Sequence, residues 1–136
     1  MQLLILLLIV GCIGVGAAVV SGIDFDFKTL IVKEYTVELS EQGLLTETFV
    51  FDVRVDDEYR MLYRNWEADV VYNDELSYPY ISVISVDSPF TSYVKDYDGT
   101  VFPTSLSESD RSFITRKASL NEIGMYNPNY FSKGEY

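Results

Sequence analysis

The N-terminal run of apolar residues limits the fold of this chain more than any other feature. Residues 3–20 are all apolar or glycine, and a stretch of this length can cross the hydrocarbon core of a bilayer as a helix. No later segment of the 136-residue sequence is comparable. We therefore expect one N-terminal hydrophobic helix followed by a single domain.

Residues 1–22 fit two interpretations. A secretory signal peptide is favoured by the small residues that end the run, at Ser21 and Gly22. An uncleaved membrane anchor is favoured by the length of the run and by the lack of lysine or arginine before it. Both interpretations place the remaining residues at the cell membrane on its extracytoplasmic side, or outside the cell.

The only cysteine, Cys12, lies within this run. Residues 9–12 are similar to a lipobox, but residues 13–22 are apolar or small where a lipoprotein has a polar tether. We favour Cys12 as a small apolar residue of the hydrophobic segment over a lipidation site. The exported part then contains no cysteine, which excludes disulfides and thiolate zinc sites there.

The charge of the chain excludes several classes of function. The net charge is −11, every charged residue follows Gly22, and there is no histidine. Such a surface repels nucleic acid and anionic lipid headgroups. The commonest general base is missing, and no glycine-rich phosphate loop occurs. We expect no catalytic residue, no cofactor, no metal and no nucleic-acid partner.

Alternation of apolar and polar residues predicts a β-hairpin after a linker or edge strand at residues 23–30. The first strand covers residues 31–39, and glycine at position 43 closes a turn before a second strand at residues 45–55. The predicted apolar face of the first strand consists of Ile31, Lys33, Tyr35, Val37 and Leu39.

Further short segments predict a mainly β domain at residues 31–136. The expected strands are residues 68–72, 80–86, 93–97 and 100–102, the last two joined by the turn Asp98-Gly99. Ser107 is expected to cap a helix at residues 110–120, residues 121–129 read as a loop, and residues 131–136 as a turn opening into a strand. This spacing is typical of an antiparallel β-sandwich or barrel, here expected to be incomplete at its C-terminus.

Glu47 is the first candidate site residue. The alternation of its strand places it on the apolar face, where an ionised carboxylate requires a partner. Arg60 and Arg64 are the nearest basic candidates, so we predict a structural ion pair from Glu47 to one of them. The alternative is a carboxyl group with a shifted pKa that serves as a general acid or base.

The segment EYRMLYRNW, residues 58–66, contains the second set of candidates. Tyr63, Arg64 and Trp66 could contact an anionic ligand or a partner through charge and ring stacking. Extended and helical conformations both bring the two arginines to one side. The alternative is that the arginines only neutralise nearby acids. The acidic run at residues 56–58 leaves a weak calcium contact open, whereas DYDG at residues 96–99 fails the calcium-loop pattern.

Three short segments together resemble a known family. They are GLLTETFVF at residues 43–51, YRMLYRNW at residues 59–66 and NEIG at residues 121–124. They are similar to the N-terminal domain of the DUF2207 family, predicted membrane proteins with no assigned activity. The resemblance implies an exported β domain and a membrane location, and it implies no reaction. Family members continue into transmembrane helices, so the resemblance implies either that this chain is a truncated relative or that another polypeptide supplies the remaining part.

Taken together, these features predict a membrane-associated extracytoplasmic β domain with a structural or protein-interaction role. A protein partner or self-assembly is expected, with membrane contact through residues 1–22 if they are retained. One alternative is a subunit of a surface filament or envelope assembly that donates residues 23–30 as a strand. The other is a carboxylate-based hydrolase.

Overall fold

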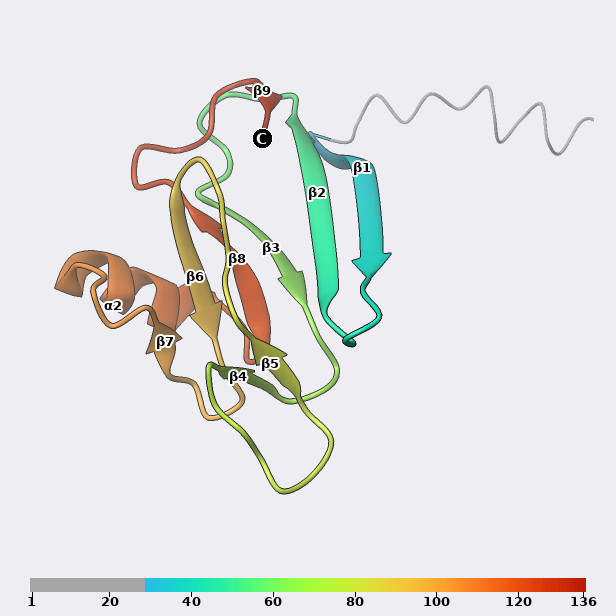
Figure 1. The fold of residues 1–136 in the computed structure, drawn as a ribbon. Helices are drawn as coiled ribbons and strands as arrows, with labels where there is room; N and C mark the ends of the chain where they lie inside the picture. The colour runs from blue at the N-terminus through green and yellow to red at the C-terminus, as the bar shows by residue number, and fades with distance from the viewer. Residues whose placement is uncertain (1–28) are drawn as a thin grey trace, which may run out of the picture.

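A computed structural model describes residues 29–136 as a mainly β domain with one short helix, as predicted (Figure 1). The predicted N-terminal helix, the signal or anchor at residues 1–22 and the lipidation alternative at Cys12 lie outside the described residues. Residues 23–28 of the donated strand in the filament alternative do so too, whereas Thr29 is described and Leu30 begins β1.

Three sheets make up the domain. The three-stranded sheet has the order β1 (Leu30–Leu39), β2 (Leu45–Val53) and β9 (Gly134–Glu135). The four-stranded sheet has the order β3 (Met61–Asn65), β8 (Glu122–Tyr126), β6 (Thr91–Lys95) and β7 (Val101–Phe102). The two-stranded sheet consists of β4 (Val70–Tyr72) and β5 (Ile81–Val83). Pairing is antiparallel in the two larger sheets, whereas β4 and β5 run parallel.

The predicted hairpin of β1 and β2 forms, but a β-bulge changes the predicted face of β1. Val32 pairs with Phe51 and Glu34 pairs with Val50, which leaves Lys33 as the extra residue. A bulge inserts one residue and therefore shifts the alternation on one side of it. Ile31 and Lys33 consequently leave the apolar face to which the sequence assigned them. Lys33 instead forms an ion pair with Glu135 at 2.5 Å.

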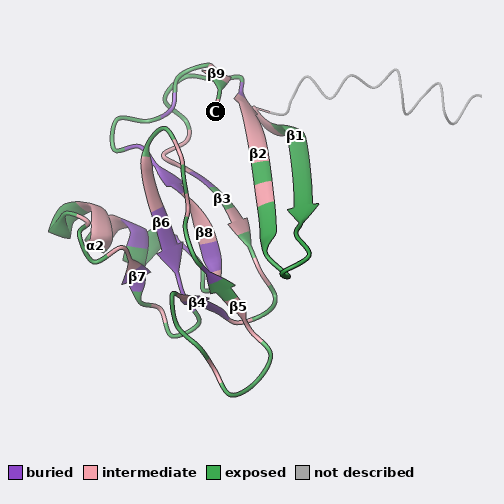
Figure 2. Cartoon of the chain, in the orientation of Figure 1, coloured by how far each residue is buried: buried purple, intermediate pink, exposed green. Residues whose placement is uncertain are grey.

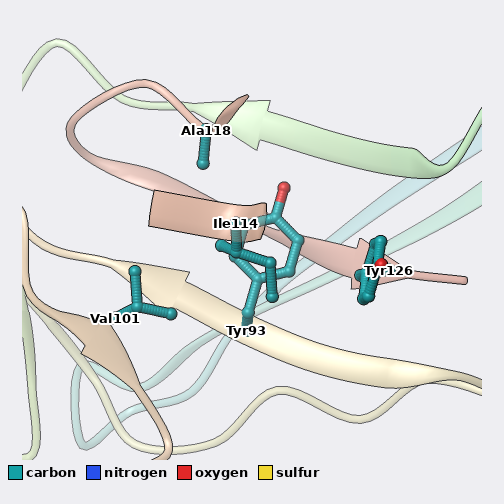
Figure 3. Packing of buried hydrophobic residues seen from close by; sticks show 5 residues of the cluster. All are labelled: Tyr93, Val101, Ile114, Ala118 and Tyr126. Carbon is teal, nitrogen blue, oxygen red and sulfur yellow. The ribbon is translucent and has the colours of Figure 1, made fainter. Parts of the chain in front are cut away.

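Helix α2 (Glu108–Lys117) covers one face of the four-stranded sheet. The Ser107 side chain caps it by accepting a hydrogen bond from Asp110 N, as predicted, although the helix begins and ends earlier than expected. Ile114 of the helix is fully buried against Tyr93 and Tyr126 of the sheet (Figure 3). Apolar burial of this kind supplies most of the stability of a short helix.

The other face of the four-stranded sheet packs on both smaller sheets. Val53 of β2 meets Leu62 and Met125 in a cluster that also contains the fully buried Phe131. A second cluster joins the β4–β5 pair to β6 and contains Val70, Val83 and Val94. The core thus lies on both faces of the four-stranded sheet, and β6 and β8 are its most buried strands (Figure 2).

The prediction of a loop at residues 121–129 was wrong. Residues 122–126 form β8, which pairs with β3 on one side and with β6 on the other. Asn121, Glu122 and Gly124 are typical of loops, but the surrounding structure provides partners for each. Asn121 adopts a φ of 58° and its side-chain oxygen accepts a hydrogen bond from Val70 N at 3.0 Å. Tertiary contacts have therefore overridden local preference.

Candidate functional site

The outer part of the β1–β2 hairpin exposes an unusual amount of apolar surface. Tyr35, Val37, Leu39 and Leu45 are 49%, 48%, 72% and 44% exposed, respectively. Cross-strand pairing puts these four side chains on one side of the hairpin, together with Glu47 and Phe49. We call these four residues the apolar shelf. Figure 2 shows β1 exposed along nearly its whole length.

The position of β1 explains why the apolar shelf is uncovered. β2 contacts the rest of the domain through its pairing with β9, through Val53 and Phe51, and through Glu47, whose partner Arg64 lies on β3. β1 lies on the far side of β2 from β3, so the hairpin overhangs the four-stranded sheet (Figure 1). The apolar shelf lies on the same face of the hairpin as Glu47, which contacts the four-stranded sheet. The shelf itself extends past the edge of that sheet and is therefore left exposed.

Glu47 lies at the inner border of the apolar shelf and has two partners. Arg64 Nε is 2.9 Å from Glu47 Oε2, and the Tyr35 hydroxyl donates a hydrogen bond to Glu47 Oε1. The Arg64 guanidinium also stacks 3.8 Å above the Trp66 ring. The hydrogen bond that the Tyr35 hydroxyl donates to the Glu47 carboxylate raises the pKa of Tyr35. Of the two arginines considered as partners of Glu47, Arg64 makes the contact.

Arg60 lies on the opposite side of the sheet from Arg64. Its guanidinium is 4.1 Å from the ring centre of Phe113 in α2, and its Nη2 donates a hydrogen bond to the Tyr126 hydroxyl at 2.5 Å. Arginine on an aromatic face is stabilised by the ring quadrupole. The expectation that both arginines share one side was therefore wrong, because Arg60 lies in a bend just before β3, where the alternation that would place it beside Arg64 does not apply. Tyr63, on the face of Arg60, is 50% exposed.

The ion pair of Glu47 and Arg64 is half-buried, and this burial determines how much it contributes to the free energy of unfolding. The Arg64 and Glu47 side chains are 34% and 13% exposed, respectively. Alanine at either position is expected to lower the free energy of unfolding by about 1–2 kcal/mol, with a coupling of about 1 kcal/mol between them. Urea unfolding, followed by fluorescence of the only tryptophan, Trp66, measures both values.

The pair of Arg54 and Asp52 provides the matched control. It has a similar N–O distance, 3.1 Å, but its side chains are 40% and 27% exposed. Arg54→Ala is therefore expected to change the free energy of unfolding by less than about 1 kcal/mol. Equal losses for Arg54→Ala and Arg64→Ala would show that burial does not strengthen the Glu47 pair.

Glu122 is a buried carboxylate that the sequence analysis did not identify. It is 1% exposed, and its Oε1 accepts a hydrogen bond from the Tyr93 hydroxyl at 2.5 Å. Its Oε2 accepts from Ser119 N at 2.9 Å and from Asn65 Nδ2 at 3.3 Å. Burial, and then the nearby Glu122 carboxylate, raise the pKa of Tyr93. With its acceptor positions occupied by the protein, Glu122 acts as a structural link between β3, β6 and the end of α2.

Lys95 is the second buried charge that the sequence did not reveal. It is 8% exposed, and its Nζ donates hydrogen bonds to the carbonyl oxygens of Thr115 and Ala118, each at 2.8 Å. These carbonyl groups lie at the C-terminus of α2, where the helix dipole favours a cation. Lys95 therefore fastens the helix to β6. A lysine at the end of a predicted strand carries no sequence signal for this role.

Asp96 and Asp98 lie together in the turn between β6 and β7. Asp96 Oδ1 accepts hydrogen bonds from Thr100 N at 2.8 Å and Asp98 N at 3.2 Å. Burial, and then the contact with Asp98, raise the pKa of Asp96 from 3.8 to about 6. Hydrogen bonds from Thr100 lower the pKa of Asp98. The two carboxyl groups order a turn, consistent with the predicted Asp-Gly hairpin.

The raised pKa of Asp96 gives stability a defined pH dependence. The folded state binds this proton more tightly than the unfolded state, so the contribution of Asp96 to stability falls as the pH rises from about 4 to about 6. Asp96→Asn removes this titration, and its stability relative to the parent is expected to increase over the same range. Urea midpoints at pH 4, 5, 6 and 7 measure the difference, with Asp87→Asn in an exposed loop as control. Parallel curves for Asp96→Asn and the parent would contradict the assignment.

A pocket of about 240 Å³ opens where β6 continues past the end of the two-residue strand β7. Aromatic and aliphatic side chains, among them Tyr72, Val86, Phe102 and Leu106, form most of its wall. Thr91 and Ser92 contribute aliphatic hydroxyl groups, and no charged residue lines it. The pocket can hold a small apolar group but has no acid or base to act on it.

The described part of the chain provides neither a grouped set of metal ligands nor a membrane-spanning helix. Within residues 29–136, no three His, Cys, Asp or Glu side chains are grouped so that they could hold a metal ion. The acidic run at residues 56–58 is tied instead to the C-terminal segment, because Asp56 Oδ1 accepts a hydrogen bond from Lys133 N at 2.7 Å. The one helix of this region, α2, is neither long nor apolar enough to cross a membrane.

Comparison with known proteins gives one result. Neither a search of curated proteins nor a search of solved structures found a match. A family model, described as the N-terminal domain of a predicted membrane protein, matches residues 32–136. These residues contain all three segments on which the resemblance rested, including the strand β8 with Glu122 and Gly124. The chain therefore belongs to the DUF2207 family of predicted membrane proteins and contains the N-terminal domain of that family.

Proposed function

We propose that this domain is a protein-interaction module on the extracytoplasmic side of a membrane, and that the apolar shelf is its contact surface. The observation that supports this proposal is the exposure of the Tyr35, Val37 and Leu39 side chains. Scattered apolar residues are normal on a protein surface, but a contiguous group marks a contact site. Here the group belongs to one strand at the outer margin of the domain (Figure 1).

The hairpin also has the backbone groups that a partner could use. Among the described residues, β1 pairs with β2 alone, so its other edge is free of hydrogen-bonded neighbours. Proteins usually protect such edges with prolines, charges or bulges. β1 has a bulge at Lys33, and its continuation from Tyr35 to Leu39 has no proline and only one charged residue, Glu38. This segment is suited to extending a sheet with a strand from a partner.

Charge and chemistry support binding over catalysis. The net charge of −11 disfavours anionic headgroups and nucleic acid, and it suits a solvated extracytoplasmic surface. Both oxygens of the Glu122 carboxylate and Oδ1 of Asp96 accept hydrogen bonds from protein donors. The Glu47 carboxylate is engaged in the same way by Arg64 and Tyr35. These contacts give each carboxyl group a structural role.

Photo-crosslinking in the organism that encodes the chain tests the proposal. A photoreactive amino acid at Val37 is expected to form adducts with a partner protein, because this side chain lies in the apolar shelf. The same amino acid at Thr36, exposed on the opposite face of the same strand, is the matched control and is expected to form far fewer. Equal yields at the two positions, or no protein adduct at either, would refute the proposal.

A further inference from the structure

The backbone of β1 is arranged so that the apolar shelf and the free edge coincide. Phe51 N and O both bond to Tyr136, on the side of β2 that faces β9. Backbone direction alternates along a strand, so Glu47 and Phe49 also direct their N–H and C=O groups away from β1. Their cross-strand neighbours Val37 and Tyr35 therefore direct their own groups to the free edge.

We propose that a second copy of this chain covers the edge, with two β1 strands paired antiparallel across a two-fold axis at Val37. This inference rests on the proposed interaction function and names its partner. The axis places Val37 opposite Val37 of the other copy and Tyr35 opposite Leu39, which joins the two apolar shelves. A two-fold contact uses the same surface on both copies and leaves neither β1 edge open for further addition.

Charges on the polar face of β1 select this register. With the axis at Val37, each Glu38 lies opposite a Thr36. An axis at Thr36 would place each Glu34 opposite a Glu38, and an axis at Glu34 or Glu38 would place that residue opposite itself. Directly opposed like charges destabilise a sheet. An axis at Tyr35 would bring the bulged residue Lys33 into the new pairing. Of the two-fold registers at residues 34–38, the one at Val37 avoids both problems.

The chemistry of the shelf favours a second copy over a lipid surface. Glu34 precedes Tyr35 and Glu38 lies between Val37 and Leu39, and the chain has a net charge of −11, so anionic headgroups are repelled. Another copy presents the same row of Tyr35, Val37 and Leu39. Pairing residues 35–39 of the two copies brings only one carboxylate per strand into the contact. That carboxylate, Glu38, lies opposite a hydroxyl group in the selected register.

Two substitutions at Thr36 test the pairing and its register together. Thr36 is exposed, so lysine or glutamate leaves the monomer core intact. With the axis at Val37, residue 36 of each copy lies opposite Glu38 of the other copy, so each substitution acts at two equivalent contacts. Thr36→Lys is expected to tighten dimerisation by about 2- to 30-fold, whereas Thr36→Glu is expected to weaken it by a similar factor. Sedimentation equilibrium of the full chain in density-matched detergent measures the dissociation constants. Val37→Lys, which puts a charge into the joined shelf, is expected to abolish the dimer.

Other outcomes would overturn the inference in distinguishable ways. If both Thr36 variants weaken the dimer, the axis lies at Thr36, where like charges meet in each case. A parent chain that stays monomeric at every concentration excludes the dimer. If it is monomeric while the amides of Tyr35 and Val37 are protected, another part of the same chain covers the edge instead. A Val37 photo-adduct with a different protein would refute the second copy and retain the interaction function, whereas no adduct would remove both.

Discussion

Glu122→Ala is expected to lower the free energy of unfolding by about 3 kcal/mol or more. The substitution removes the acceptor for the buried Tyr93 hydroxyl and for the part-buried Ser119 N, and an unsatisfied buried donor costs about 1–3 kcal/mol. It also leaves a cavity in the most buried part of the four-stranded sheet. Urea unfolding followed by Trp66 fluorescence provides the measurement.

Glu122→Gln is the matched variant. The amide oxygen can still accept one of the hydrogen bonds and the side chain keeps its volume, so the expected loss is about half that of alanine. Tyr93→Phe provides a second variant, which leaves the carboxylate without one of its donors. A loss below about 1 kcal/mol for Glu122→Ala would contradict a structural role for this carboxylate.

Gly124→Ala is expected to be at least as damaging. Gly124 lies in the middle of β8, opposite Tyr63 on one side and Tyr93 on the other. An added Cβ would lie 2.5 Å from the carbonyl oxygen of Leu62 and 2.8 Å from Cβ of Tyr63. Because the closest atom belongs to the backbone of a paired strand, relief requires separating β3 from β8. We expect a loss of about 3 kcal/mol or more, or failure to fold.

Gly43→Ala separates this steric effect from general effects of removing glycine. Gly43 has no atom within 4 Å of the added Cβ, but its φ is +80°. Alanine is strained there by about 1 kcal/mol, without a clash. Comparable losses for Gly43→Ala and Gly124→Ala would contradict the close approach of β3 and β8.

The elements that depend on short-range sequence patterns were predicted correctly. The β1–β2 hairpin, the turn at Asp98-Gly99 and the cap at Ser107 all form, because alternation, turn chemistry and capping act within a few residues. The strand β8 was missed because Asn121, which precedes it, and its own Glu122 and Gly124 are explained only by distant partners, Val70, Tyr93 and Tyr63. The bulge at Lys33 likewise depends on the register with β2.

The candidate site was only partly predictable for a similar reason. The alternation of β2 put Glu47 on an apolar face, and the need of a carboxylate for a partner pointed to a nearby arginine. The choice between Arg60 and Arg64 required knowing which layer each side chain enters. Exposure of the apolar shelf could not be predicted at all, because the alternation of β1 is the same whether or not a second layer covers it.

Hydrogen exchange of the β1 amides tests the central proposal most directly. Thr36 and Glu38 direct their amides to β2, whereas those of Tyr35, Val37 and Leu39 point to the free edge. In the full chain in lipid nanodiscs, pairing through this edge predicts slow exchange at all five positions, with protection of the outward three increasing with protein concentration. Fast exchange at Tyr35, Val37 and Leu39 at every concentration, beside slow exchange at Thr36 and Glu38, would contradict pairing of the edge with a second copy.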